Sequence, residues 1–399
     1  MTGLDAAKLS RSERRRSLAA AIACISVFAV TVGLVTPLIS LILEARGIQP
    51  TTIGAIAAMP SLAILVTTPL IPWFVRRLGL RGFLSLCIAG ELVLVLLLPL
   101  FDHLAVWFVL RGLMGATGAG LFVASETWIN EVAEERSRGR VVAVYGAIIS
   151  GSFALGPFII SITGTEGWLP FLVAAAFIAG AGLPLLRSGR LSPAISGQAS
   201  FGVFSFLLVA PTLAAAILLS GFKEMSMAAL LPVYGVHSGL SEPAAAVMLT
   251  AVALGALVFQ LPIGWAADHM NRYLLLIIVA AAALMGALLL PLIVTQGGLA
   301  LWLGLAFWGG VFSGVYIVAM VLVGERFRGP DLVAANAAFG LLWGSGGLAG
   351  PILSGSAMDI WGSNGFPGLL AAATALFVLL AVYRRLRRTS ASGSGAEDG

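Results

Sequence analysis

Long apolar runs separated by short polar segments dominate the hydrophobicity pattern of this chain. Runs of about 18 residues or more recur along its length, and each is long enough to cross about 30 Å of hydrocarbon as a helix. The short segments of alternating polarity that a strand barrel needs are absent from the sequence, so helices must satisfy the backbone hydrogen bonds. The pattern predicts twelve spans, at residues 18–43, 51–75, 82–101, 104–130, 140–162, 167–186, 203–236, 243–267, 273–295, 298–324, 332–358 and 364–383.

The second half of the chain repeats the layout of the first. Matching residues recur 194 or 195 positions later, namely Pro37 and Pro232, Leu104–Trp107 and Leu299–Trp302, Gly115 and Gly310, Gly146 and Gly340, and Gly156-Pro157 and Gly350-Pro351. Matches spread this evenly indicate a duplicated six-helix unit. The predicted fold class is therefore an all-α membrane protein, with twelve transmembrane helices arranged as two parallel six-helix repeats.

Polar segments divide the chain into five parts. We expect a basic N-terminus at 1–17, six-helix bundles at 18–187 and 203–384, a central linker at 188–202, and a disordered tail at 385–399. The linker is rich in glycine, serine and proline, as connecting segments are. The tail is rich in serine and glycine, a composition typical of disorder.

Lysine and arginine positions indicate how the spans are oriented. An even number of spans puts both termini on one side, and 20 of the 23 Lys and Arg residues fall in the termini and loops of that side. Positive residues concentrate on the cytoplasmic side of membrane proteins. We therefore expect both termini in the cytoplasm of a cell with a bacterial-type inner (plasma) membrane. The formal net charge of +5 then reflects topology and indicates no nucleic-acid partner.

Composition excludes a soluble globular protein. Hydrophobic residues make up 59% of the chain and charged residues only 10%, with a mean hydropathy of +1.02. The two cysteines, Cys24 and Cys87, fall inside predicted spans, so neither indicates a disulfide or a metal site. We expect no cofactor. We also expect a monomer, because a twelve-span unit with an internal pathway needs no partner subunit.

Span 4 carries an arginine inside an otherwise lipid-compatible helix. Helical spacing puts Gly115 and Gly118 within about 40° of Arg111, and Glu126 about 60° away. Exposing the guanidinium to lipid would cost at least about 2.5–3.5 kcal/mol, so Arg111 must face protein or a water-filled cavity. Two interpretations remain open: Arg111 lines a solute pathway, or it ties two packed helices together across the small glycine face.

Span 7 contains the adjacent charges Lys223 and Glu224. Neighbouring helical residues point about 100° apart, so the two side chains cannot face the same partner, yet both must avoid lipid. One interpretation is a structural pairing between helices. The preferred hypothesis is that Glu224 binds and releases a proton during transport, while Arg111 or Lys223 binds an anionic group or couples to Glu224.

Two loop segments resemble the signature G-x-x-x-D-R-x-G-R of one transporter superfamily. Residues Gly264–Arg272 read GWAADHMNR and match it except at His269 and Asn271. The first-half counterpart, Pro72–Arg81, has Arg76 where the aspartate belongs. Arg76 cannot accept the hydrogen bonds that an aspartate accepts, so a first-half latch of this kind is not expected.

Helix motifs support the same resemblance. Arg111 and Gly115 match an R-x-x-x-G pattern, and Gly156-Pro157 and Gly350-Pro351 resemble the G-x-x-x-G-P pattern of antiporter branches. A Gly-Pro pair interrupts helical hydrogen bonding, which provides either a hinge or only a site of close packing. The strings at 125–131 and 136–146 are similar to those of the YcaD-type branch. The chain thus resembles the major facilitator superfamily, YcaD-type branch, over most of its length.

The resemblance implies where the functional residues lie. Substrate would bind near the midplane between the two halves, with spans 1, 4, 7 and 10 lining the cavity, which places Lys223 or Glu224 across from Arg111. Asp268, followed by Arg272, would accept hydrogen bonds from the start of an opposing helix such as span 5 and latch one conformation.

Further residues are candidates on position alone. Glu126 lies about 22 Å beyond Arg111, within reach of Arg76, Arg77 or Arg81, where it would either gate the pathway or anchor the topology. Polar and aromatic side chains that could contact solute, or only pack, are Tyr145, Gln260, Trp308, Tyr316, Asn336 and Trp343.

The expected function is secondary active transport of a small organic solute by alternating access, coupled to protons and directed outward as an antiporter. A proton-coupled importer of a sugar, amino acid or organic acid is the alternative. A membrane-embedded enzyme or sensor is disfavoured because His103, His237 and His269 fall at three separate span ends and no nucleotide-binding loop occurs. The expected partners are the lipid bilayer, the solute and protons.

Overall fold

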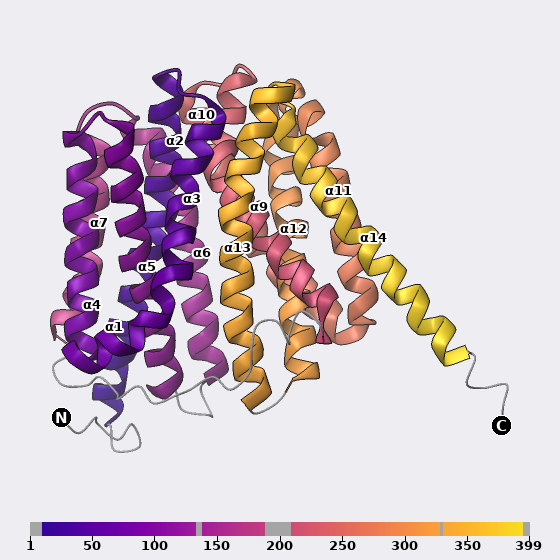
Figure 1. Ribbon diagram of the computed structural model, residues 1–399, viewed down its shortest axis with the longest axis horizontal. Coiled ribbons are helices and arrows are strands. Elements are labelled where there is room, and N and C mark those ends of the chain that lie inside the picture. The colour runs from indigo at the N-terminus through magenta and orange to yellow at the C-terminus, as the bar shows by residue number, and fades with distance from the viewer. Residues whose placement is uncertain (1–9, 133–137, 188–208, 328–329, 394–399) are drawn as a thin grey trace. The chain divides into compact units, whose positions relative to one another are not determined.

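The computed structural model describes residues 10–132, 138–187, 209–327 and 330–393, and these residues form helices joined by short turns without any strand (Figure 1). The elements are α1 (Arg11–Val30), the π-helical turn η2 (Thr31–Val35), α2 (Thr36–Ala45), α3 (Pro50–Thr67), the 3₁₀ turn η3 (Thr68–Leu70), α4 (Ile71–Leu97), the 3₁₀ turn η4 (Leu98–Leu100), α5 (Leu104–Val132), α6 (Arg138–Thr163), α7 (Leu169–Arg187), α9 (Pro211–His237), α10 (Glu242–His269), α11 (Arg272–Gln296), α12 (Gly298–Arg326), α13 (Pro330–Trp361) and α14 (Gly365–Gly393).

Within these residues, nine helical segments are long and apolar enough to cross a membrane. One of them, Pro50–Leu100, spans 51 residues and contains a sharp break at Gly79, whose φ of 71° is readily adopted only by glycine. Predicted spans 2 and 3 lie on either side of that break. The prediction of a helical membrane fold is confirmed, whereas the number of twelve spans stays a prediction.

Several predicted segments fall at or beyond the limits of the described chain. The linker at 188–202 lies outside the described residues, as does the N-terminus up to residue 9. Helix α14 continues to Gly393, so helical structure extends into the tail segment that was expected to be disordered.

The chain divides into two compact units. Unit 1 comprises Met1–Gln198 together with Met227–Thr250, and unit 2 comprises Ala199–Ser226 together with Ala251–Gly399. In unit 1, α1 packs against α5, α6 and α7, and α5 packs against α3 and α4. In unit 2, α11 packs against α12 and α14. The hairpin between α9 and α10, from 227 to 250, belongs to unit 1 although both helices begin or end in unit 2.

A proline accounts for the wide turn in the first span. Pro37 has no N–H to donate to the carbonyl of Gly33, and its ring collides with that carbonyl in a regular α-helix. The backbone relieves this collision through the π-helical turn η2 just before Pro37. The first predicted span therefore consists of two helices, α1 and α2. The turn η2 joins them and changes the direction in which the side chains of α2 point relative to those of α1.

The π turn packs against the part of α6 that contains Pro157. Because Pro157 lacks an N–H, the carbonyl of Phe153 loses its usual helical donor. A Cβ on Gly33 would lie 3.0 Å from that carbonyl oxygen, and a Cβ on Gly156 would overlap the backbone of Gly33. Only glycine at both positions allows the two backbones to approach this closely.

We predict that Gly156→Ala destabilises unit 1 by about 1–3 kcal/mol because the added methyl group overlaps backbone that cannot move aside. Gly151→Ala on the same helix is the matched control, since nothing lies within 4 Å of its added Cβ. Thermal unfolding of the detergent-solubilised protein measures both. Equal unfolding temperatures for the two variants would contradict the close contact at Gly33.

Candidate functional site

A carboxyl group and a guanidinium lie buried together in unit 1. Glu91 on α4 has no exposed surface, and Arg111 on α5 is 2% exposed. The hydroxyl of Thr117 donates to Glu91 Oε1 at 2.8 Å, and the hydroxyl of Thr31 donates to Glu91 Oε2 at 3.5 Å. The carboxyl group is thus held by hydroxyls from two different helical elements, while Arg111 attracts it electrostatically.

Arg111 uses only part of its hydrogen-bonding capacity. Its Nη2 donates to the Thr36 hydroxyl at 2.8 Å, and its buried Nε has no hydrogen-bond partner among the described residues. A guanidinium carries five N–H donors in a fixed fork. The site therefore has spare donor capacity next to a carboxyl group.

The predicted glycine face of α5 brings neighbouring helices up to this pair. A Cβ on Gly115 would overlap the backbone of Pro60 on α3, so the two backbones are in direct contact. A Cβ on Gly118 would lie 3.1 Å from the ring of Phe28 and 3.6 Å from Glu91 Oε1. Arg111 faces protein in this structure, as the cost of exposing it to lipid requires.

Sequence reasoning missed Glu91. The signal was present, because Glu91 is the one acidic residue in the predicted span at 82–101. An ionisable residue inside a membrane span indicates a functional site by default. Thr31, Thr36 and Thr117 carried no comparable signal, because threonines occur commonly in membrane helices.

The two span-7 charges lie in unit 2 with aromatic partners. Lys223 is buried, with its ammonium 4.9 Å from the ring centroid of Phe312 on α12. Half-buried Glu224 accepts a hydrogen bond from the indole of Trp343 on α13 at 3.3 Å. The adjacent charges thus point to different helices, as their spacing predicts.

Glycines on α13 bring it close to α9 beside these charges. A Cβ on Gly346 would overlap the Leu218 carbonyl oxygen, and one on Gly350, just before Pro351, would overlap the Phe222 carbonyl oxygen. The hydroxyl of Ser354 also donates to that of Ser226 at 3.1 Å. The Gly-Pro motif of span 11 is therefore a site of close backbone packing.

The second-half loop motif forms a local charge network in unit 2. Arg272 lies 3.8 Å from Asp268, donates to the Ala267 carbonyl at 2.8 Å, and forms an ion pair with Glu325 on α12. Glu325 was not a candidate from the sequence. The motif ties the turn between α10 and α11 to the end of α12.

In the first half, the predicted charge network around Glu126 is not formed in this structure. Glu126 is exposed and has no hydrogen bond or ion pair among the described residues. The guanidinium of Arg77 stacks on Trp73, 4.8 Å from the ring centroid, and Arg76 is exposed while Arg81 is half-buried. A gating contact between Glu126 and these arginines stays a prediction.

The remaining candidates differ in exposure. Trp308 is 1% exposed and donates to the Ala283 carbonyl at 3.1 Å, so it packs α12 against α11. Gln260 and Tyr316 are exposed, and Tyr145 is half-buried. The side chain of Asn336 lies outside the described residues. Within the described parts of the chain, no cluster of His, Cys, Asp or Glu is placed to hold a metal ion.

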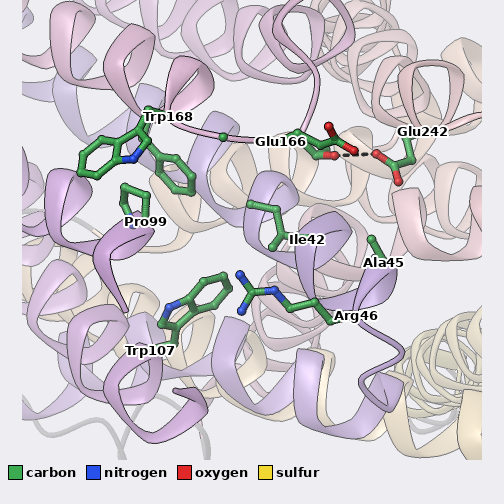
Figure 2. Close-up of a pocket in the computed structure, with 11 residues that line it drawn as sticks. Ile42, Ala45, Arg46, Pro99, Trp107, Glu166, Trp168 and Glu242 are labelled. Carbon is green, nitrogen blue, oxygen red and sulfur yellow. Dashed lines mark hydrogen bonds between the residues drawn. The ribbon is translucent and has the colours of Figure 1, made fainter. Parts of the chain in front are cut away.

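A cavity of about 330 Å³ opens at the end of unit 1 where α2 stops (Figure 2). The guanidinium of Arg46 lies 4.9 Å from the ring centroid of Trp107 and 2.9 Å from Asp102. Two contacts connect the α9–α10 hairpin to this end: His237 lies 2.6 Å from Glu44, and the Thr165 hydroxyl donates to Glu242 at 2.6 Å. The end of α2 is thus joined to its surroundings by charged contacts.

Buried ionisable groups inside a helical bundle long and apolar enough to span a membrane mark a functional site within the membrane. Residues 19–246 and 213–399 each match the sequence model of the Major Facilitator Superfamily, and the chain belongs to this family of transporters. The two matches overlap at residues 213–246, and together they cover almost the whole chain.

Similar sequences in bacteria are also named as transporters of this superfamily. The chain is 27% identical over 365 residues to the uncharacterized MFS-type transporter YfkF of Bacillus subtilis (strain 168), covering 85% of this chain and 88% of that protein. It is 26% identical over 369 residues to the uncharacterized MFS-type transporter YcaD of Escherichia fergusonii, covering 90% and 94%. The resemblance to the YcaD-type branch is confirmed.

Solved structures share the fold at low sequence identity. A mutant of the nucleoside transporter NupG superposes with a TM-score of 0.77 at 14% identity, covering 92% of this chain and 99% of NupG. A D-xylose-proton symporter superposes with a TM-score of 0.71 at 17% identity, covering 94% and 97%. These likenesses establish the major facilitator fold with its two repeats.

We predict that Glu91 and Arg111 are energetically coupled. Removing either charge alone, by Glu91→Gln or Arg111→Met, leaves its partner buried without compensation and destabilises the protein by about 3–5 kcal/mol. The double variant should lose less than the sum of the single losses, by about 0.5–3 kcal/mol. Denaturation of the four proteins in detergent measures this cycle, and strictly additive losses would show that the two groups do not interact.

Proposed function

We propose that this transporter couples solute movement to protons, and that Glu91 is a proton-binding group of its first half. One observation carries the proposal: a fully buried carboxyl group lies in a membrane-spanning helix, next to Arg111, with the hydroxyls of Thr31 and Thr117 as its hydrogen-bond partners. The proposal adds Glu91 to Glu224, the proton carrier expected from the sequence.

The chemistry of the Glu91 environment suits a change of protonation. A carboxylate away from water is costly unless it is paired and hydrogen-bonded, and taking up a proton removes its charge. Hydroxyl groups serve either form, because each can donate to a carboxylate or accept from a carboxylic acid. Arg111, with its unpartnered Nε, can compensate the anion when the proton leaves.

Lys223 and Glu224 supply the second charged site. Lys223 lies against Phe312, and Glu224 is hydrogen-bonded to Trp343, so each charge has an aromatic surface beside it. A small organic solute with an anionic group would suit Lys223, while Glu224 binds the coupling proton in this half. These roles follow the general rule that intramembrane ionisable residues mark solute and proton pathways.

We infer outward transport by a monomer, with both termini in the cytoplasm of the inner membrane. The arginine distribution supports the orientation. The similarity of Gly156-Pro157 to antiporter motifs supports export. The Asp268, Arg272 and Glu325 network then lies at the cytoplasmic end, where it would latch unit 2 during the transport cycle.

We predict substrate-dependent proton movement in liposomes that contain the purified protein and a trapped pH-sensitive dye. Pools of nucleosides, sugars, amino acids and organic acids provide the solutes. The proton signal should be lost in Glu91→Gln and in Glu224→Gln, because a glutamine cannot release a proton. Glu131→Gln is the matched control, since Glu131 is an exposed carboxylate near the end of α5. Wild-type solute flux without any proton movement would contradict proton coupling.

We predict opposite directions for the two fluxes. In the same liposomes, an imposed proton gradient should move the solute against the direction in which protons flow, because an exporter of this kind is an antiporter. A radiolabelled or dye-reported solute from an active pool measures this. Solute that moves in the same direction as the protons would instead establish a symporter and overturn the export proposal.

A further inference from the structure

The π turn η2 lies between the two contacts that connect the first span to the buried charges. Thr31, the first residue of the turn, donates to Glu91, and Thr36, the residue directly after it, accepts from Arg111. The carboxyl group is therefore bound to the α1 side of the turn, and the guanidinium is bound to the α2 side. Any change in the turn must affect both contacts.

Helix geometry explains why both threonines face the same pair. In an α-helix, residues five apart differ by about 140° in direction, so Thr31 and Thr36 could not both point at adjacent partners. In a π turn each residue advances by roughly 80°, so the same two residues differ by only about 40°. The wide turn brings the two hydroxyls onto one face.

The same geometry shows what would happen if the π turn were lost. If η2 became α-helical, α2 would rotate about the helix axis relative to α1 by about 90–100°, the angle between neighbouring residues of a helix. The Thr31–Glu91 and Thr36–Arg111 contacts could not both survive that rotation. The two contacts thus hold the π turn in place, and its backbone is supported by the glycine contact between Gly33 and Gly156.

Any such rotation would also move the side chains at the far end of α2. Helix α2 is a single ten-residue element, about 15 Å long, and two charged contacts lie at its end, of which that of Arg46 lies at the cavity in Figure 2. Glu44 contacts His237 of the α9–α10 hairpin, and Arg46 contacts Asp102 and Trp107. A rotation of this size would carry both side chains away from these partners.

We propose that η2 is a rotary coupling element, which transmits the charge state of Glu91 to the contacts of Glu44 and Arg46 at the end of α2. The inference rests on the proton binding proposed for Glu91. With Glu91 charged, Thr31 is held and η2 keeps its π geometry. With Glu91 neutral, Thr31 is released, η2 tightens to the α-helical winding that α9 keeps through the equivalent Pro232, and α2 turns away from the α9–α10 hairpin.

The strength of the Thr31 contact supports this sequence of events. Hydrogen bonds to an ionised group are about twice as strong as those between neutral groups. At 3.5 Å, the Thr31 contact is longer than the 2.8 Å contacts made by Thr117 and Thr36. It is therefore the contact that a loss of charge on Glu91 releases first.

The charged and titratable groups facing Glu91 are few among the described residues. Arg111 faces it from α5, and the thiol of Cys87 faces it from one turn earlier on α4. Cys24 on α1 interacts electrostatically with Cys87. Around Glu44 and His237, the end of unit 1 also carries Arg46, Asp102, Glu166 and Glu242.

Cysteine cross-linking tests the coupling without knowledge of the substrate. In a background with Cys24 and Cys87 replaced by alanine, Glu44→Cys and His237→Cys create a pair across the α2 contact, and a short thiol-specific cross-linker reports its proximity. We expect cross-linking to slow about fivefold in Glu91→Gln, Thr31→Val and Thr36→Val, the change given by one net hydrogen bond of about 1 kcal/mol. All reactions are run at one pH, because thiol reactivity itself depends on pH.

Two controls separate rotation of α2 from general loosening. Thr31→Ser keeps the hydroxyl and should cross-link at the parental rate. A second cysteine pair, Thr165→Cys with Glu242→Cys, replaces the contact between the α9–α10 hairpin and the loop before α7, which does not involve α2. Its rate should stay unchanged in Glu91→Gln and Thr31→Val.

The outcomes are distinct. Unchanged cross-linking at 44 and 237 in folded Thr31→Val and Thr36→Val would overturn the coupling, and so would equal slowing of both cysteine pairs. Because Glu91→Gln fixes the neutral state, the result does not depend on whether Glu91 takes up protons during transport. Loss of proton movement in the liposome assay would therefore refute the proposed function while leaving the cross-linking result to decide on η2.

Discussion

The burial of the Arg111 guanidinium inside a membrane-spanning helix is the constraint on which unit 1 depends. Lipid offers no partner for such a charge, and exposure at the bilayer centre is unfavourable by at least about 2.5–3.5 kcal/mol. Neighbouring helices must therefore come close and supply oxygen atoms. Glycines on α5 permit the approach, Thr36 accepts a hydrogen bond from the guanidinium, and Glu91 attracts it electrostatically.

Much of this architecture follows from simple patterns in the chain. Apolar runs place the helices, and the regular offset between residues such as Pro37 and Pro232 is enough to reveal the duplication. The loop motif at 264–272 and the Arg111 position indicate the family. These features can be predicted because they depend on local sequence and on the single demand that lipid makes of a backbone.

Other parts of the site depend on contacts that no periodicity encodes. A 3.6-residue period assigns Thr31 and Thr36 to different faces, and only the π turn brings them together. Glu91 stands alone in an apolar run, so its partners on η2 and α5 emerge only from packing. For Trp308 the sequence leaves both solute contact and packing open, and only the structure shows its indole N–H satisfied inside the α11–α12 interface.

The two repeats differ in their backbone mechanics. Pro232 in α9 corresponds to Pro37, but α9 runs through it as a continuous α-helix, and Ala228 occupies the position equivalent to Gly33. Gly350 meets the α9 backbone at Phe222, about 1.7 turns before Ala228. The first half therefore has a π turn before its proline, whereas its counterpart in the second half is a continuous α-helix. Two helices that descend from one duplicated segment, and that both keep its proline, can thus differ in backbone geometry.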